Sequence, residues 1–70
     1  MKAMLAYRYL TAEDSDAFCH KVTRALSGGW SLFGDPSYAF DAAAGVMRCG
    51  QAVVKEVDVA YDPALKLGDL

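Results

Sequence analysis

The stretch from Val46 to Val57 is the longest strand pattern in the chain, and it constrains the fold more than any other segment. Its middle, Gly50 to Val54, carries small or β-branched residues at positions that point to both faces of a strand. Such a segment suits a strand that is covered on both sides, because a solvent-facing side would carry alternating polar residues. We therefore expect it to lie in the middle of a sheet.

A helix is predicted between residues 14 and 27. Four apolar residues fall at the spacing i, i+4, i+7 and i+8, which gives one apolar stripe along a helix: Phe18, Val22, Ala25 and Leu26. Thr11 and Asp14 are candidate N-terminal caps, and Gly28-Gly29 can close the helix with a left-handed residue.

Two further strands are predicted, over residues 3–10 and 30–40. The first is rich in strand formers, and the second alternates in part, with four residues in phase on one face: Trp30, Leu32, Tyr38 and Phe40. Gly34-Asp-Pro36 interrupts the second strand, and because a proline cannot donate to a ladder, we expect a kinked strand at a sheet edge. Residues 41–45 are predicted to form a hairpin turn in which Gly45 takes a positive φ.

The predicted fold class is α+β, with β-α-β-β topology. A helical crossover leaves the first two strands parallel in direction, and the hairpin makes the third antiparallel to both, so the third fits between them. We expect a three-stranded antiparallel sheet in the order 1-3-2 with one helix on one face. This domain spans residues 1–57, and residues 58–70 form a C-terminal tail that is loosely ordered or packed on a neighbouring subunit.

The sheet face that the helix leaves bare is apolar in either phase of the first strand. It carries Leu5, Tyr7 and Tyr9, or else Met4, Ala6 and Leu10. A domain of 70 residues buries only about 60% of the surface that its unfolded chain exposes, so its stability alone is marginal. Because a bare apolar sheet face is an association site, we expect a homo-oligomer, most simply a twofold dimer.

Charge and cysteine usage argue against several classes of protein. The seven basic and nine acidic residues are spread along the chain and leave no electrostatic footprint for nucleic acid or anionic lipid. The longest run without a charge, residues 25–34, is about half the length of a bilayer span. Cys19 and Cys49 show no CxxC spacing and follow no apolar leader, which favours a reduced cytoplasmic protein with both thiols buried as small hydrophobes.

The residues that carry chemistry do not form a catalytic constellation. His20, the only histidine, is predicted on the polar face of the helix. Its neighbour Cys19 points about 100° away on a helix, so the two cannot act as nucleophile and base. Asp16 and His20 lie at i and i+4, but no further His or Cys cluster completes a metal site. We therefore expect no enzyme activity, no metal and no cofactor.

Short motifs along most of the chain resemble one known family. These are Tyr7-Arg-Tyr-Leu-Thr11, a helix that ends in Gly29-Trp30, and Gln51-Ala-Val-Val-Lys55. Over residues 5–56 the chain resembles the small, mostly bacterial domain-of-unknown-function family numbered 1737. The resemblance implies a compact strand-helix-strand-strand unit and Asp14 as the cap, and it brings no assigned activity. Asp35-Pro36 and the tail from Val57 depart from the pattern.

Six residues are candidates for an interface or a ligand surface: Tyr7, Tyr9, Trp30, Tyr38, Gln51 and Val53. A polar group in mid-strand needs a partner, so Gln51 either bonds across an oligomer interface or lines a small ligand site. The leading hypothesis is a self-associating interaction or accessory domain that uses the bare sheet face, with a second copy or another protein as its partner. The alternative is a small-molecule-binding module with its site at the subunit interface.

Overall fold

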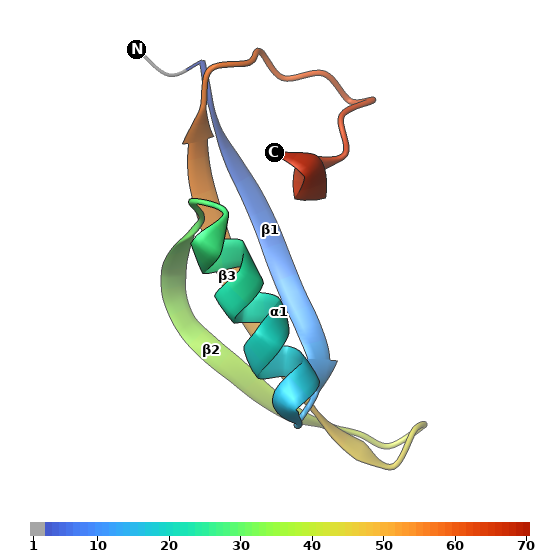
Figure 1. Ribbon diagram of the computed structural model, residues 1–70. Helices are drawn as coiled ribbons and strands as arrows, with labels where there is room; N and C mark the ends of the chain where they lie inside the picture. The colour runs from blue at the N-terminus through green and yellow to red at the C-terminus, as the bar shows by residue number, and fades with distance from the viewer. Residues whose placement is uncertain (1–2) are drawn as a thin grey trace.

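The computed structural model describes residues 3–70, so residues 1 and 2 of the predicted domain lie outside the described residues. The elements follow in the order β1 (Met4–Glu13), α1 (Asp16–Ser27), β2 (Ser31–Asp41), β3 (Val46–Val57) and a short 3-10 helix, η1 (Leu67–Asp69). The strands form one antiparallel sheet in the order β1-β3-β2, and α1 lies across one face (Figure 1). The predicted α+β class, topology and central position of β3 are confirmed.

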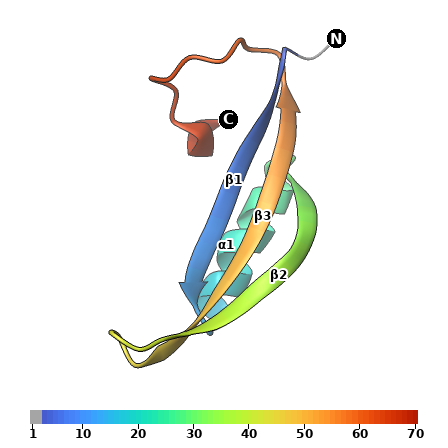
Figure 2. The same ribbon diagram turned by 180° about the vertical axis from the view of Figure 1, so that it is seen from behind.

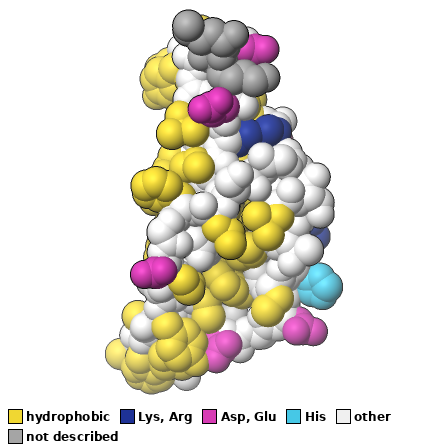
Figure 3. All heavy atoms as spheres, turned by 90° about the vertical axis from the view of Figure 1, so that its left-hand side faces the viewer, with side chains coloured by type: hydrophobic (Ala, Val, Ile, Leu, Met, Phe, Trp, Pro, Cys, Tyr) yellow, Lys and Arg dark blue, Asp and Glu magenta, His cyan; other side chains and the backbone are white. Residues whose placement is uncertain are grey.

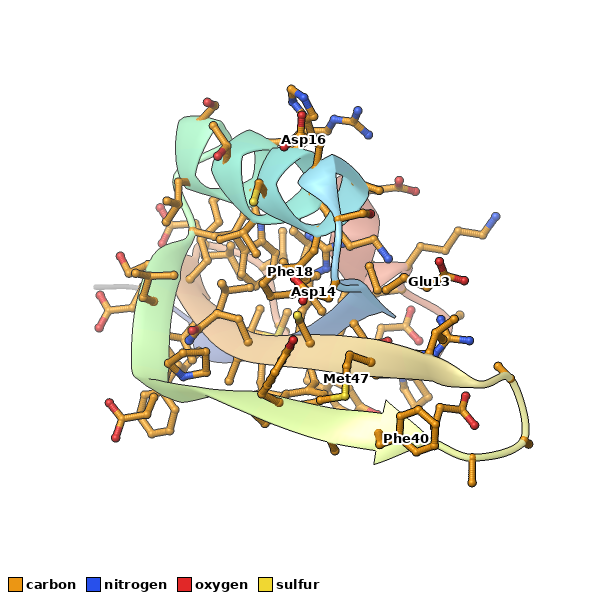
Figure 4. All side chains as sticks on the ribbon, turned by 90° about the horizontal axis from the view of Figure 1, so that it is seen from below. Glu13, Asp14, Asp16, Phe18, Phe40 and Met47 are labelled. Carbon is orange, nitrogen blue, oxygen red and sulfur yellow. The ribbon has the colours of Figure 1, made fainter. Side chains whose placement is uncertain are left out.

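The core lies between α1 and the sheet. It is built from five buried residues that come from all four main elements or their ends: Ala6, Leu10, Ala25, Trp30 and Val53. Ala6 and Leu10 therefore face the helix, and alternation along β1 directs Leu5, Tyr7 and Tyr9 to the other side. Figure 4 shows Phe18 between α1 and the sheet, whereas Asp16 lies on the outer side of the helix.

The predicted helix stripe is correct except at its end. Val22 is half-buried and packs against the core, and Ala25 is buried, but Leu26 is 42% exposed. The cause is its position around the helix: at about 100° per residue, Leu26 lies at the border of the stripe, about 80° around the axis from Phe18.

Neither predicted N-terminal cap is correct. The cap is Ser15, whose Oγ accepts a hydrogen bond of 3.3 Å from the Ala17 amide. The Asp14 carboxylate instead accepts a hydrogen bond of 2.5 Å from the Tyr38 hydroxyl, and its backbone amide donates to the Met47 carbonyl. Because these two bonds tie Asp14 to the β2–β3 hairpin, α1 begins one residue later than a cap at Asp14 would allow.

Glycines set three changes of chain direction. Gly29 has a φ of 94° after the helix, and the Trp30 amide then donates to the Ala25 carbonyl. The chain therefore turns at the end of α1 and enters β2 at the edge of the sheet. Gly45 has a φ of 69° in the predicted hairpin turn, which is confirmed. The register of β2 shifts between Phe33 and Ser37, around Gly34 at a φ of 71°, so the predicted interruption of this edge strand is confirmed as well.

The tail, residues 58–70, folds back and packs against β1 and the core of its own chain. It arcs away from the end of β3 and brings η1 beside β1 (Figure 1). Leu70 packs against the core, and its carbonyl accepts a hydrogen bond of 2.5 Å from Lys55 Nζ. The tail therefore covers one end of the helix-covered side of its own chain.

Candidate functional site

The sheet face opposite α1 carries a row of exposed apolar side chains, which we call the open face. Figure 2 shows the three strands with no other element across them, and Figure 3, which views the β2 edge, shows hydrophobic side chains along the left-hand outline, on the side away from His20 and the helix. The four largest are between 50% and 61% exposed: Leu5, Tyr7, Tyr9 and Phe33. By the strand register, Ala52 of β3 lies between Tyr9 and Phe33 at the middle of this face.

The ring of Tyr9 crosses the open face from β1 to β2. Its hydroxyl is hydrogen-bonded to the hydroxyl of Ser37, and Gly50 of β3 lies beneath the ring. A Cβ atom on Gly50 would lie only 2.6 Å from both Tyr9 Cζ and Ser37 Oγ. The absence of a side chain at residue 50 therefore allows the ring to lie flat across the central strand.

The structure divides the six candidate residues between the two sides of the sheet. Tyr7 and Tyr9 lie on the open face and are about half exposed. Trp30, Gln51 and Val53 are buried on the helix-covered side. Tyr38 lies on the helix side too, is 60% exposed and donates its hydroxyl to Asp14. The six residues therefore do not form one surface.

The partners of Gln51 belong to its own chain. Its side-chain amide donates to the carbonyls of Phe33 and Gly34, each at 3.3 Å, and to that of Ala52 at 2.9 Å. Phe33 and Gly34 lie where β2 loses its regular register, so their carbonyls need partners outside the ladder. The buried amide of Gln51 thus holds the kink of the edge strand against the central strand.

Tyr38 and its neighbours join the start of α1 to the hairpin. The hydrogen bond to Asp14 raises the pKa of the Tyr38 hydroxyl, because the bond stabilises the protonated phenol beside a carboxylate. Desolvation, followed by the negative charge of Asp14, raises the pKa of the Cys49 thiol. Cys49 is therefore a protonated, half-buried thiol, which does not suit a nucleophile.

A cleft lies on the helix-covered side between α1, β1 and the tail. Its volume is about 470 Å³. We call it the cationic cleft. Its lining includes three basic side chains, one acidic side chain and two apolar residues: Arg8, Lys21, Arg24, Asp69, Trp30 and Leu70. The protein as a whole has a net charge of -2, so this concentration of positive charge is local.

Trp30 is buried on the helix-covered side, and two cationic side chains lie near its ring. The guanidinium carbon of Arg8 lies 5.2 Å from the centre of the ring, and Lys55 Nζ lies 5.9 Å from it. Lys55 also donates to the Gly28 carbonyl at 2.8 Å and to the Leu70 carbonyl at 2.5 Å. Lys55 therefore links the end of α1 to the tail, and Arg8 is left to the cleft.

The other groups with reactive chemistry lie apart. His20 and Cys19 are exposed on α1, so the prediction of a buried thiol is wrong for Cys19, which points about 100° away from its core-facing neighbour Phe18. Across residues 3–70, no group of three or more His, Cys, Asp or Glu side chains is arranged to hold a metal ion. The same residues contain no helix with the length and apolar composition that a membrane span requires.

A family model with the description "Domain of unknown function (DUF1737)" matches residues 4–56. The chain belongs to this family. The resemblance seen in the sequence motifs is thus confirmed, and the match covers β1, α1, β2 and nearly all of β3. No curated protein and no solved structure matches this DUF1737 domain. The family description assigns no function, so its function must be inferred from its own surfaces.

Sequence reasoning missed the cationic cleft of this DUF1737 domain. The lining residues Asp69 and Leu70 lie in the tail, beyond the family match. One signal was available: Arg8 occupies a core-facing position of β1, between Ala6 and Leu10, where an apolar residue is the usual choice.

Proposed function

We propose that this DUF1737 domain is a self-associating interaction domain that forms a twofold homodimer through its open face. The observation that carries the proposal is the row of exposed apolar side chains, which no part of residues 3–70 covers. Four such side chains, each about half exposed, leave on the order of 400 Å² of apolar surface in water, within the range of functional patches.

The small size of the hydrophobic core supports a second copy of the chain as the occupant of the open face. Among the described residues only seven hydrophobic side chains are buried, and three of these are alanines. A domain of this length gains little stability from its own core, and oligomerisation is a common remedy. A stable dimer buries about 800 Å² per partner, so the apolar centre would supply half and the polar residues around it the rest.

The shape of the open face suits an isologous contact. In such a contact the same surface meets its copy, so it must carry both protruding groups and space to receive them. Phe33 protrudes, with 57% of its surface exposed. A hollow of about 440 Å³, lined in part by Leu5, Ser31 and Val54, lies at one end of the face.

Binding, not catalysis, is the activity that we propose, with a second copy or another protein as the partner and no role for nucleic acid or membrane. A reducing cytoplasm of a bacterial cell suits this domain, because Cys19 and Cys49 are both free thiols. The small-molecule alternative at a subunit interface receives less support, because Trp30 and Gln51 are buried within the protomer.

Native mass spectrometry and light scattering test the dimer. The wild-type chain should be a dimer at low micromolar concentration, and Tyr7→Lys, which places a charge on the open face, should be a folded monomer by circular dichroism. Thr23→Lys adds the same charge on an exposed position of α1 and should leave the dimer intact. A wild-type monomer at about 100 µM would refute self-association, and a Tyr7→Lys dimer would refute the open face as its surface.

A further inference from the structure

The cationic cleft lies on the opposite side of the sheet from the open face, and its chemistry is independent of self-association. Its charged groups come from two elements and the tail: Arg8 from β1, Lys21 and Arg24 from α1, and Asp69 from η1. Three basic side chains and one acidic side chain therefore line the cleft, and Lys21 Nζ also donates to the Thr11 carbonyl at 2.8 Å. An excess of positive charge around one hollow raises the local concentration of anions.

The guanidinium groups of the cleft are not held in ion pairs by the described residues. Within residues 3–70, neither Arg8 nor Arg24 forms an ion pair or a side-chain hydrogen bond. Arg8 is half-buried, and its guanidinium group forms a cation–π contact with the Trp30 ring. No fully buried side-chain nitrogen among the described residues lacks a partner, so the donors of Arg8 open on the cleft.

The end of α1 does not compensate for this charge. Helix carbonyls attract cations, but here they are already occupied. The Ala25 carbonyl accepts from the Gly28 and Trp30 amides, and the Leu26 carbonyl accepts from the Gly29 amide. Lys55 Nζ donates to the Gly28 carbonyl at 2.8 Å. The donors of Arg8 and Arg24 are thus available to a ligand.

The cleft also has an apolar wall and the size of a small-ligand site. Trp30, Ala25 and Leu70 line it beside the cations, and its volume of about 470 Å³ lies in the range of sites for small molecules. We propose that this cleft binds a small molecule through an oxyanion group, a phosphate or a carboxylate, which Arg8 and Arg24 hold with Lys21 beside them. Guanidinium groups bind both oxyanions with paired, charge-assisted hydrogen bonds.

The fluorescence of Trp30 provides the test, because it is the only tryptophan in the chain and it lines the cleft. The full chain is titrated with pyrophosphate and, separately, with citrate at constant ionic strength. Saturable binding of pyrophosphate indicates a phosphate ligand, and saturable binding of citrate indicates a carboxylate ligand. Either supports the proposal if the affinity falls about tenfold in both Arg8→Gln and Arg24→Gln.

Arg48→Gln is the matched control, because it removes the same charge at an exposed position in the hairpin, where Arg48 pairs with Asp41. Its affinity should equal that of the wild type. Equal weakening in Arg48→Gln would overturn the proposal, since it would show an effect of net charge alone. Absence of saturation by either anion below about 10 mM would also overturn it. If Arg8→Gln does not fold, the exposed Arg24 still decides the outcome.

Discussion

The ring of Tyr9 lies across Gly50, so the side chain of an edge strand takes the place of a side chain that the central strand lacks. We expect Gly50→Ala to push this ring off the sheet, because its Cβ would lie 2.6 Å from both Tyr9 Cζ and Ser37 Oγ. Overpacking of this kind costs about 1–3 kcal/mol in the free energy of unfolding. Urea denaturation measures the loss.

The cost of Gly50→Ala should depend on Tyr9. In a Tyr9→Ala background the ring is gone and the Ser37 hydroxyl can rotate away, so the added methyl group should be tolerated. A double-mutant cycle isolates this coupling. An equal loss of stability from Gly50→Ala in both backgrounds would show that the backbone at residue 50, and not the Tyr9 ring, requires glycine.

Gln51→Met should destabilise the fold although it keeps the volume of the side chain. The buried amide of Gln51 is a partner of the Phe33 and Gly34 carbonyls, and an apolar replacement leaves these without it. The expected loss is about 1–3 kcal/mol in the free energy of unfolding. Chemical-shift changes should concentrate at residues 33–37. A variant as stable as the wild type would show that the kink of β2 does not need this side chain.

Much of the fold followed from local patterns in the sequence. The two-sided apolar character of residues 50–54 identified the central strand, Gly45 identified the hairpin turn, and the interruption at Gly34-Asp-Pro36 identified the kink of β2. The cap at Ser15 did not follow. It depends on the bond between Asp14 and Tyr38, which lie 24 positions apart, and local preference ranks aspartate and serine almost equally as caps.

The candidate site was predictable only in part. Alternation placed Tyr7 and Tyr9 on one face, but it did not say which face of the sheet the helix covers. Packing decides this, through Ala6 and Leu10 against Trp30. The cationic cleft depends on the return of the tail to Arg8, a contact between distant parts of the chain that no local pattern encodes.

Asp41 should make the stability of the hairpin depend on acid. Hydrogen bonds from the Ala44 amide, the Arg48 side chain and the Ala43 amide hold the pKa of the Asp41 carboxyl below its ordinary value of 3.8. At pH values around the folded and unfolded pKa of Asp41, the folded state therefore binds fewer protons than the unfolded state, and the free energy of unfolding rises with pH. The contribution is complete above the unfolded pKa and is lost as the pH falls through the folded pKa.

Asp41→Asn tests this dependence. The wild type should be the more stable of the two at pH 7, and the difference should disappear as the pH falls below the folded pKa. Thermal denaturation at several values from about pH 2 to about pH 7 measures the stability of the wild type and of Asp41→Asn as a function of pH. A difference that stays constant with pH would show that Asp41 contributes through its shape and not through its charge.

Lys55→Met should release the tail from the helix end. Lys55 Nζ donates to the Gly28 and Leu70 carbonyls, and methionine keeps the apolar stem that packs near Trp30 but not the donors. Amide hydrogen exchange in residues 67–70 should become faster, and the free energy of unfolding should fall by about 1–3 kcal/mol. Lys66→Met is the matched control, because Lys66 is an exposed tail lysine whose side chain forms no hydrogen bond or ion pair within residues 3–70. Faster exchange in both variants would mean that charge, and not the two bonds of Lys55, holds the tail in place.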